Sequence, residues 1–408
     1  MSDEDIEEHI TGLIMIHQYT LKKGLELYGD KAEKATVKEF TQIHDMDTYT
    51  PMDASKLTRE QKTKALSSLL FLTKKRDGRI KARQCAVGSK QRTFEGYNKA
   101  DGSSPTISTD GLLISAAIDG HENRSVLCLD IPGAFLNADN DEFVLMCLRG
   151  KMAEMMVKVD PSIYRKYVVT GRNGVPHLYV KLNKALYGLL KAALLFYKKL
   201  VGELKSMGFV LNKYDPCVAN RIVNGSQQTV CWHVDDLKVS HVDPEVNESF
   251  AKDIMKIYGN KVTINRGDIH DYLGIDFDFS HANETKISMI KYLHKIIETF
   301  PEEIGKPVDA PHQDWLFKIR DDPSIQLPEE QAQQFHHTVA QLLFVAMRAR
   351  PDIQTSVSFL TKRVQKPDED DWNKLKRVLR YLKGTKHMKL SLRVDNLNTI
   401  CWWVDAAY

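Results

Sequence analysis

The stretch VCWHVDDLKVSHVD, residues 230–243, places two adjacent carboxylates in the middle of a strand-like pattern. Apolar side chains alternate with other residues before Asp235 and again after Asp236, which predicts two strands joined by a tight turn. Aspartate is favoured in turns because of its local hydrogen bonds, so these residues alone indicate a hairpin. A metal site would need another acid, remote in the sequence, beside this hairpin.

A candidate for that acid is Asp130, which ends an apolar run in VLCLDIPGAFLNADNDE. Aspartate is a poor strand former and is costly to desolvate, so a strand that closes on it calls for a partner. If this strand lay beside the hairpin, Asp130 would meet Asp235 and Asp236, and the three carboxylates would repel one another unless cations bound. Such ligands suit Mg²⁺, and two Mg²⁺ ions can support phosphoryl transfer.

The composition is that of an ordinary globular protein, with 408 residues, 27% of them charged and 42% hydrophobic. This length allows about two or three domains. The six cysteines form no C-x-x-C pair, so neither a zinc site nor a disulfide framework is indicated, and a reducing compartment fits best. The acidic start MSDEDIEEHI is not a signal peptide, and no apolar run approaches the roughly eighteen residues of a membrane span. We expect a soluble protein of the cytoplasm with no membrane partner.

The net charge of +3 is too small to indicate a nucleic-acid partner, so its distribution matters more. Basic side chains concentrate in residues 74–92, KKRDGRIKARQCAVGSKQR. This stretch is either a solvated basic hairpin that turns at Asp77 and Gly78 or a clamp for phosphates. A second basic series lies on the helix predicted in PDEDDWNKLKRVLRYLKGT, residues 367–385, on a different face from its apolar residues. Alone, that series indicates only a solvated face.

The chain contains no internal repeat, and its elements change character along its length. Residues 3–72 predict mainly helices, including the segment TREQKTKALSSLLFL at 58–72. Helices return from about residue 284. Asn224 and Gly225 predict a hairpin turn. Between these helical parts, strands are predicted around residues 125–131, 178–183, 217–223, 228–234, 237–242 and 272–279.

Six motifs in a fixed order resemble the reverse transcriptase of copia-type retrotransposons. They are KARQCAVGSKQR, LDIPGAFLNADNDE, LNKALYGLLKAALLFY, WHVDDLKVSH, DYLGIDF and the segment from Arg350 to Thr385. The resemblance runs from about residue 35 to the end of the chain. It implies an α+β right-hand polymerase whose palm is a ferredoxin-like antiparallel sheet with helices, flanked by fingers and a helical thumb. The implied segments are a helical N-terminal extension (1–34), fingers with the basic hairpin (35–125), palm (126–282), helical thumb and connection (283–396) and a truncated first strand of a ribonuclease H domain (397–408).

The resemblance also implies which residues form the catalytic centre. Asp130 and Asp235 would ligate both metal ions, and Asp236 would support them as the third acid. Ile131 would lend its backbone carbonyl. The expected cofactor is Mg²⁺, two ions, for which Mn²⁺ is a substitute.

The nucleotide side of the site follows from the same resemblance. Lys81 and Arg83 match fingers residues that face the incoming triphosphate, where cationic donors suit phosphate oxygens. Phe135 matches the bulky residue beneath the sugar that excludes a 2′-hydroxyl, although an aromatic core residue is the plainer alternative. Tyr187 and Gly188 fall in the loop that floors the nucleotide pocket.

The template and primer would contact other parts of the chain. Gly274 lies in the element that resembles the one positioning the primer end. The basic residues expected to hold nucleic acid are Lys74, Lys75 and Arg76 in the fingers and Lys376, Arg380 and Lys383 in the thumb.

The sequence departs from the family pattern at several places. The family's usual YVDD begins with His233 here, so an imidazole replaces the aromatic ring near the primer end. The segment 190–193 reads LKAA where the family has KQSP, and Val87 stands where an arginine is common. Because the metal ligands are unchanged, these departures bear on the nucleotide pocket more than on polymerisation.

The predicted function is therefore an RNA-directed DNA polymerase that extends a primer on an RNA or DNA template with deoxynucleoside triphosphates. A catalytically inactive nucleic-acid-binding remnant of a retroelement and a metal-dependent nuclease are the alternatives. No integrase-like or protease-like segment precedes the polymerase motifs, so we expect other parts of a polyprotein as partners. Virus-like particles in the cytoplasm are an expected location.

The end of the chain resembles the start of another domain. Asp405 matches the first metal-binding acid of a ribonuclease H domain, but one acid cannot hold two ions. We therefore expect no cleavage of RNA–DNA hybrids by this chain.

Overall fold

The computed structural model describes residues 18–75, 78–94, 97–98, 102–171, 173–319, 326–401 and 404. These residues form a mixture of sheets and helices, as the predicted α+β class requires. The chain divides into two compact units, unit 1 (Met1–Thr106 and Ile131–Phe209) and unit 2 (Ile107–Asp130 and Val210–Tyr408). The units do not coincide with the five predicted segments, which stay a prediction.

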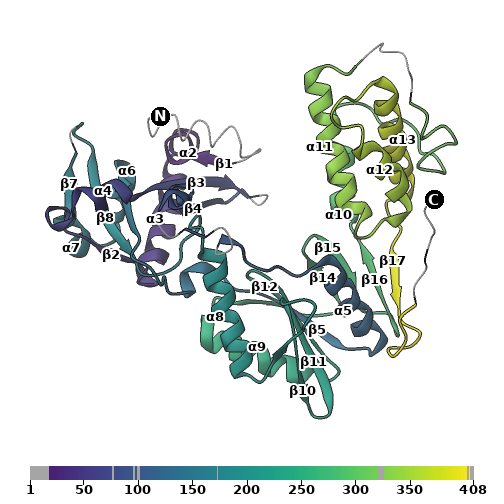
Figure 1. The fold of residues 1–408 in the computed structure, drawn as a ribbon, viewed down its shortest axis with the longest axis horizontal. Helices are drawn as coiled ribbons and strands as arrows, with labels where there is room; N and C mark the ends of the chain where they lie inside the picture. The colour runs from purple at the N-terminus through teal and green to yellow at the C-terminus, as the bar shows by residue number, and fades with distance from the viewer. Residues whose placement is uncertain are drawn as a thin grey trace. The chain divides into compact units, whose positions relative to one another are not determined.

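Unit 1 is built on a seven-stranded sheet in the order β1-β3-β6-β8-β2, with β4 paired to β3 and β7 paired to β8 (Figure 1). Its strands are β1 (Gln18–Thr20), β2 (Tyr49–Pro51), β3 (Leu66–Lys74), β4 (Ile80–Ala86), β6 (Leu145–Arg149), β7 (Val168–Thr170) and β8 (Pro176–Leu182). Its helices are α2 (Leu21–Tyr28), α3 (Asp30–Asp45), α4 (Arg59–Lys64), α6 (Lys151–Val159), α7 (Pro161–Tyr164) and α8 (Ala192–Ser206). Short 3₁₀ turns are η1 (Ala54–Lys56), η2 (Gly88–Thr93), η4 (Ala134–Asn137) and η5 (Arg165–Tyr167).

The helix predicted across residues 58–72 is wrong beyond its first turns. The helix α4 begins with a capping box at Thr58 and ends at Lys64, after which Leu66–Lys74 form β3. This strand pairs with β1, β4 and β6, and both Leu69 and Leu70 are buried although they point to opposite faces. Burial on both faces removes the period-2 signal of a strand, and long-range pairing overrides the local helical preference.

Unit 2 contains two antiparallel sheets and a group of helices. The larger sheet has the order β13-β5-β12-β11-β10-β9, and the smaller has the order β14-β15-β16-β17. The larger sheet comprises β5 (Ser125–Asp130), β9 (Val210–Leu211), β10 (Val218–Val223), β11 (Ser226–His233), β12 (Asp236–His241) and β13 (Thr263–Asn265), and the smaller comprises β14 (Ile269–Tyr272), β15 (Ile275–Asp278), β16 (Glu284–Ser288) and β17 (Leu390–Arg393). The helices are α5 (Thr109–His121), α9 (Pro244–Tyr258), α10 (Ile290–Thr299), α11 (Glu329–Ala346), α12 (Gln354–Thr361), α13 (Glu369–Thr385) and the 3₁₀ turn η6 (Pro351–Ile353).

Two turns test the strand predictions in unit 2. Asn224 and Gly225 form the predicted hairpin turn, with φ angles of 51° and 80° between β10 and β11. The strand predicted around 272–279 is present as β15 but begins only at Ile275, because the chain folds back at Leu273 and Gly274, whose φ angles are 52° and 78°. Leucine is not a residue that signals such a turn, which is why the sequence did not indicate it.

The helices α5 and α9 cover opposite faces of the larger sheet. Lys238 of β12 contacts α5, whereas Gln228 of β11 hydrogen-bonds to α9. Lys238 pairs with Cys231 of β11, so these two side chains share one face of the sheet. Gln228 lies three residues before Cys231 on the same strand and therefore points to the opposite face. Both faces of the strands that carry the acidic motif are therefore buried.

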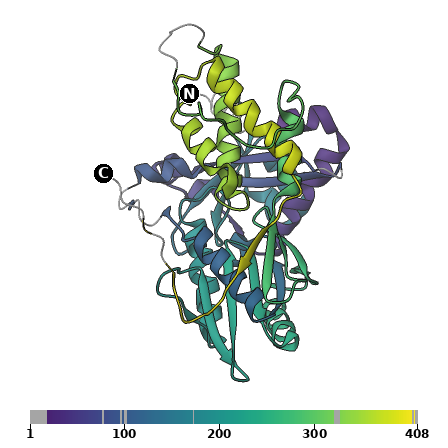
Figure 2. The ribbon, with the colours of Figure 1, turned by 90° about the vertical axis from the view of Figure 1, so that its right-hand side faces the viewer.

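The remaining helices, α10 to α13, pack together through apolar faces. The face of α13 predicted from its spacing is buried, since Leu375, Val378, Leu379 and Leu382 are all 0% exposed. After α13 the chain, yellow in Figure 2, runs from this bundle to β17, which pairs with β16. None of the helices in the described part of the chain has both the length and the apolar character that a bilayer span requires.

Candidate active site

The acidic motif forms the hairpin between β11 and β12. His233 pairs with Asp236, so Val234 and Asp235 are the two turn residues and Asp236 begins β12. Val234 has a φ angle of 58°, a left-handed conformation that a β-branched residue rarely adopts. The turn is thus held under strain, which is common where a side chain must be presented in one orientation.

Asp130 lies next to this hairpin at the end of β5. The register pairs Asp130 with Asp236 across two antiparallel strands, and residues so paired have Cβ atoms about 4.5–5.5 Å apart on one face. The structure therefore brings Asp130, Asp235 and Asp236 together where β5 ends and β12 begins. Ile131 follows Asp130 directly, and its side chain is buried.

The electrostatics of Asp236 reflect this crowding. Partial burial, together with the neighbouring charges of Asp235 and Asp130, raises the pKa of Asp236 from 3.8 to about 6, and His233 acts in the opposite direction. Proton binding by Asp236 is favoured because the charged form is both desolvated and repelled. A divalent cation at this site would relieve the same repulsion.

The donor set fits Mg²⁺ rather than a closed, all-protein metal site. In the described ranges, no three His, Cys, Asp or Glu side chains are grouped so that together they could hold a metal ion. Mg²⁺ binds through one or two carboxylates and takes its other oxygens from water and substrate phosphates. The carboxylates of Asp130 and Asp236, paired at the ends of two neighbouring strands, match that requirement.

A tyrosine ties the acidic hairpin to the predicted primer element. The hydroxyl of Tyr272, the last residue of β14, donates to the backbone carbonyl of Asp236 at 3.0 Å. Burial raises the pKa of Tyr272 well above its ordinary value, so the hydroxyl remains a donor. Tyr272 directly precedes the Leu273–Gly274 turn, and this contact fixes the turn relative to the acids. The sequence motif DYLGIDF contained Tyr272, but its role was not predicted.

The predicted nucleotide residues come together within unit 1. Lys81 and Arg83 are exposed on β4, and two residues apart they share one face. The guanidinium carbon of Arg83 lies 4.1 Å from the centre of the Tyr187 ring, a cation–π contact. The Tyr187 ring lies 4.7 Å from that of Phe135, centre to centre. Arg83 thus stacks on Tyr187, and Tyr187 in turn contacts Phe135 with the two rings tilted by 55°.

Two residues that the sequence interpretation missed, Gly88 and Gln91, hold the Gly188 loop against the end of β4. A Cβ atom on Gly88 would lie 2.0 Å from the carbonyl oxygen of Gly188, and one on Gly188 would lie 2.1 Å from that of Ala86. Gly188 also has a φ angle of 86°, which favours glycine. The side-chain oxygen of Gln91 accepts a hydrogen bond from the backbone nitrogen of Leu190 at 3.0 Å. Gly88 and Gln91 lie in the motif AVGSKQR, whose glycine was the available signal.

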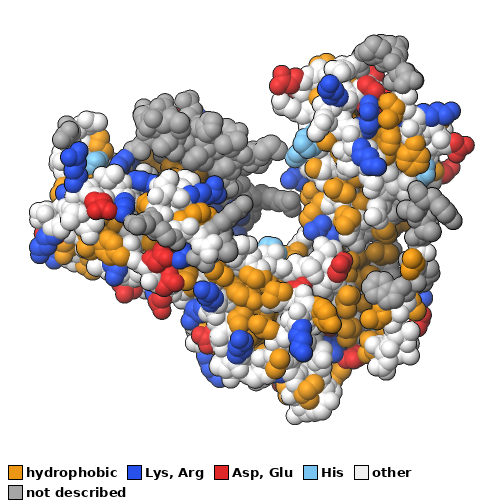
Figure 3. All heavy atoms as spheres, viewed as in Figure 1, with side chains coloured by type: hydrophobic (Ala, Val, Ile, Leu, Met, Phe, Trp, Pro, Cys, Tyr) orange, Lys and Arg blue, Asp and Glu red, His pale blue; other side chains and the backbone are white. Residues whose placement is uncertain are grey.

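The basic residues predicted to hold nucleic acid differ in their surroundings. Lys74 and Lys75 are exposed at the end of β3, and Arg76 lies outside the described residues. On the face shown in Figure 3, Lys and Arg side chains are scattered among neutral and acidic ones rather than gathered in one field. This distribution agrees with the small net charge of +3.

The three bases of α13 hold a neighbouring segment of their own unit. Lys376 forms an ion pair with Glu302 at 2.7 Å. Arg380 donates to the carbonyl of Lys306 at 2.7 Å, and Lys383 donates to that of Gly305 at 3.0 Å. They are therefore not simply a solvated face, and their contact with nucleic acid stays a prediction.

The repulsion at Asp236 predicts a pH-dependent change in stability. Because the folded-state pKa of about 6 lies above the ordinary 3.8, ionising Asp236 destabilises the fold as pH rises through this window. Without divalent cations, Asp236→Asn should raise the melting temperature by about 2–4 °C at pH 8 and by about half as much at pH 5. Thermal melts in chelator at both pH values measure this. Asp253→Asn, a surface control on α9, should show no such pH dependence, and an equal gain for Asp236→Asn at both pH values would contradict the interpretation.

Comparisons with known proteins agree with this arrangement. The family model described as reverse transcriptase (RNA-dependent DNA polymerase) matches residues 52–312. The chain is 25% identical over 363 residues to the retrovirus-related Pol polyprotein from transposon TNT 1-94 of Nicotiana tabacum, covering 86% of this chain and 25% of that polyprotein. It is 26% identical over 282 residues to the putative transposon Ty5-1 protein of Saccharomyces cerevisiae, covering 69% and 83%.

The chain is also similar to a further polyprotein and to a solved structure. The truncated transposon Ty1-A Gag-Pol polyprotein of Saccharomyces cerevisiae is 23% identical over 374 residues, which cover 88% of this chain and 29% of that protein. A solved structure of the foamy viral protease-reverse transcriptase in complex with double-stranded DNA has a TM-score of 0.47 and 12% identity, covering 87% of this chain and 48% of that one. The chain spans only about a quarter of the tobacco polyprotein. The predicted resemblance to copia-type retrotransposon Pol proteins is confirmed, and the chain belongs to the reverse transcriptase (RNA-dependent DNA polymerase) family.

Proposed function

We propose that this chain extends a primer on an RNA or DNA template with deoxynucleoside triphosphates, as the polymerase segment of a copia-type Pol polyprotein. The observation that carries the proposal is the register of β5 against β12, which pairs Asp130 with Asp236 beside Asp235. A protein that only bound nucleic acid would gain nothing from three carboxylates at one place, because they repel phosphates. The family membership supports the same activity.

In the proposed reaction the chain mainly positions charged groups. Asp130 and Asp235 would hold two Mg²⁺ ions, with Asp236 as the third acid and the carbonyl of Ile131 as a further oxygen. When bound, the ions would lower the charge of the phosphates and activate the attacking 3′-oxygen. The protein's own contribution is to keep the carboxylates facing one another, which the strained turn and the strand register support.

On the nucleotide side, Lys81 and Arg83 would bind phosphate oxygens of the incoming triphosphate. Tyr187 supports this by stacking beneath the guanidinium of Arg83 and so limiting its directions. Phe135, whose ring contacts that of Tyr187, would lie beneath the sugar. Template and primer would be held by exposed bases such as Lys74 and Lys75, and the turn at Gly274 would position the primer end.

Because the chain spans a quarter of the tobacco polyprotein, the partners of the whole protein also belong to the proposal. We expect other segments of a Pol or Gag-Pol polyprotein to work with it in the cytoplasm. Those segments would supply activities for which the described residues give no site, ribonuclease H among them. Of the predicted strand at 397–408, residues 402–403 and 405–408, Asp405 included, lie outside the described residues, and residues 397–401 and 404 belong to no strand.

A primer-extension assay on poly(A)/oligo(dT) with dTTP tests the proposal. The chain should elongate the primer in Mg²⁺ and should stop when the ion is chelated. Binding of the labelled primer–template, measured by fluorescence anisotropy, separates extension from affinity. A folded chain that binds the primer–template but adds no nucleotide in Mg²⁺ or Mn²⁺ would instead be an inactive remnant.

A further inference from the structure

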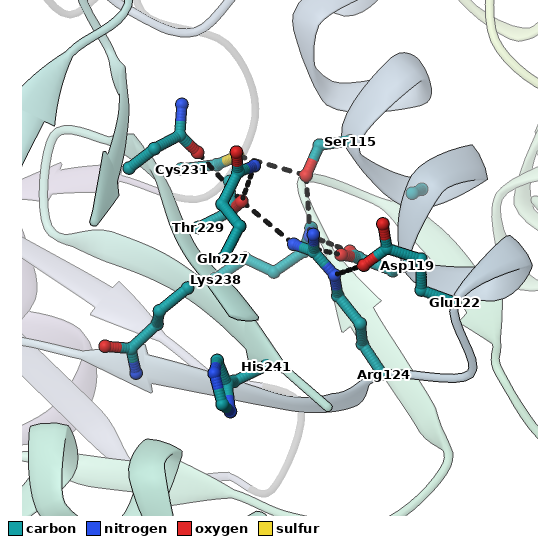
Figure 4. A network of polar contacts seen from close by, with 12 residues as sticks. Ser115, Asp119, Glu122, Arg124, Gln227, Thr229, Cys231, Lys238 and His241 are labelled. Atoms are coloured by element: carbon teal, nitrogen blue, oxygen red, sulfur yellow. Dashed lines mark hydrogen bonds and ion pairs between the residues drawn. The ribbon is translucent and has the colours of Figure 1, made fainter. Parts of the chain in front are cut away.

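A buried network of charges lies on one face of the sheet that carries the acids (Figure 4). Lys238 of β12 is 1% exposed, and its ammonium donates to the carboxylate of Asp119 on α5 and to the hydroxyl of Ser115 at 3.0 Å. The Asp119 side chain is likewise fully buried. The alternation of apolar and polar residues in LKVSH is typical of a strand with one solvent-facing side, but α5 buries that side here.

Arg124 extends the network to the other strand of the hairpin. Its side chain is 2% exposed, and it forms an ion pair with Glu122 at 2.8 Å and lies 3.8 Å from Asp119. It also donates to the hydroxyl of Thr229 on β11 at 3.0 Å. Lys238 and Thr229 belong to the two strands of the acidic hairpin, so both strands are tied to α5 and the segment after it. Figure 4 shows these side chains converging from the helix and the strands.

The network lies directly behind the acids. Lys238 follows Asp236 by two residues on the same strand, so the two side chains project from the same face about 7 Å apart. The register pairs Lys238 with Cys128, which precedes Asp130 by the same two residues. The buried charges therefore occupy the row next to the one that carries Asp236 and Asp130.

Folding stability alone does not account for such a network. A buried ion pair is often no more stabilising than apolar residues of similar size, because desolvation offsets the attraction. A buried ion pair does restrict geometry, because hydrogen-bonded charges in a low dielectric are satisfied in only a few arrangements of the elements that carry them. Apolar contacts between α5 and the sheet would tolerate small shifts of the hairpin that these bonds resist.

We propose that Lys238 is a positioning residue that, through Asp119 and Ser115, fixes the acidic hairpin against α5 and so sets the spacing of Asp130, Asp235 and Asp236. This rests on the proposed polymerase function for its catalytic consequence. The mechanical part, that the pair restrains the hairpin, is measurable whether or not the chain polymerises.

Two variants separate positioning from stability. Lys238→Met leaves Asp119 buried without its main partner, so it should lower the melting temperature and slow extension. Lys238→Met with Asp119→Leu removes both charges, and Arg124 keeps Glu122. The double variant should melt close to the parent but still extend at least about tenfold more slowly in kcat, with the KM for dTTP changed less than about twofold. Recovery of both stability and kcat in the double variant would overturn the proposal.

Hydrogen exchange gives the readout that does not need activity. The amides of residues 233–237 should exchange at least about tenfold faster in the double variant than in the parent. Arg350→Met is the matched control, because Arg350 is a buried cation of the same unit, 2% exposed and paired with Asp352 at 2.7 Å. It should lower stability without accelerating exchange at 233–237. Equal acceleration by the control, or none in the double variant, would overturn the positioning role, whereas a parent that fails to extend would overturn only the polymerase proposal.

Discussion

Asp235→Asn is expected to lower primer extension at least about a thousandfold, equal to roughly 4 kcal/mol of transition-state stabilisation. The amide keeps the shape of the side chain but loses the charge that would hold the metal ions. Asp235 occupies the turn itself, so the substitution disturbs no strand pairing. Binding of the primer–template should change by no more than a few-fold, because phosphate contacts come from bases elsewhere in the chain.

Single-turnover extension on poly(A)/oligo(dT), with binding measured in parallel, gives both quantities. Asp253→Asn is a matched control, since it removes the same charge from the surface of α9, where Asp253 pairs with Lys256 at 2.8 Å. The control should extend like the parent. Parental rates for Asp235→Asn would remove Asp235 from the catalytic centre and with it the present assignment.

The acids illustrate what the sequence can predict about a site. Asp130 was a candidate because an acid that ends an apolar strand is costly, and that reasoning uses only local residues. The pairing of Asp130 with Asp236 was expected only if two remote strands were neighbours, and the register shows that they are. A residue whose burial costs free energy thus indicates that it has a partner. Which residue is the partner depends on which strands are neighbours in the sheet.

Lys238 shows where this reasoning fails. A lysine that alternates with apolar residues normally faces solvent, and nothing near it in sequence signals otherwise. Its partner Asp119 lies in α5, a helix from far earlier in the chain whose own pattern is weakly amphipathic. Burial of a charge by a remote helix leaves no periodic signal, so neither residue was predicted to matter.

The helix prediction for the segment that forms β3, Leu66–Lys74, was wrong for a related reason. Its leucines are buried on both faces of β3, and the strand pairs in parallel with β6 from much later in the chain. A run without alternation is compatible with helix or strand, and only the distant partner decides between them. In contrast, Asn224 and Gly225 specify their turn through their own backbone preferences, and that prediction is confirmed.

Phe135→Val is expected to relax discrimination against ribonucleotides by about 10–100-fold, measured as the ratio of kcat/KM for dTTP to that for UTP. Phe135 is half-buried, and its ring packs 4.7 Å from Tyr187 and 6.5 Å from Phe196, centre to centre. Valine keeps an apolar side chain but removes the ring, which opens the space in which a 2′-hydroxyl would lie. The rate with dTTP should fall less than the rate with UTP rises.

The two contacts of Phe135 distinguish a sugar-sensing ring from a core residue. Phe196 is 1% exposed on α8 and touches Phe135 from the buried side, so Phe196→Leu perturbs the same packing without opening the pocket. If Phe135 lies beneath the sugar, Phe135→Val should change the dTTP-to-UTP ratio, while Phe196→Leu should lower only the melting temperature. If both variants lose stability and leave the ratio unchanged, Phe135 is a core aromatic that supports Tyr187. In that case the role of the Phe135 ring is to support Tyr187, on which Arg83 stacks, and not to block a 2′-hydroxyl.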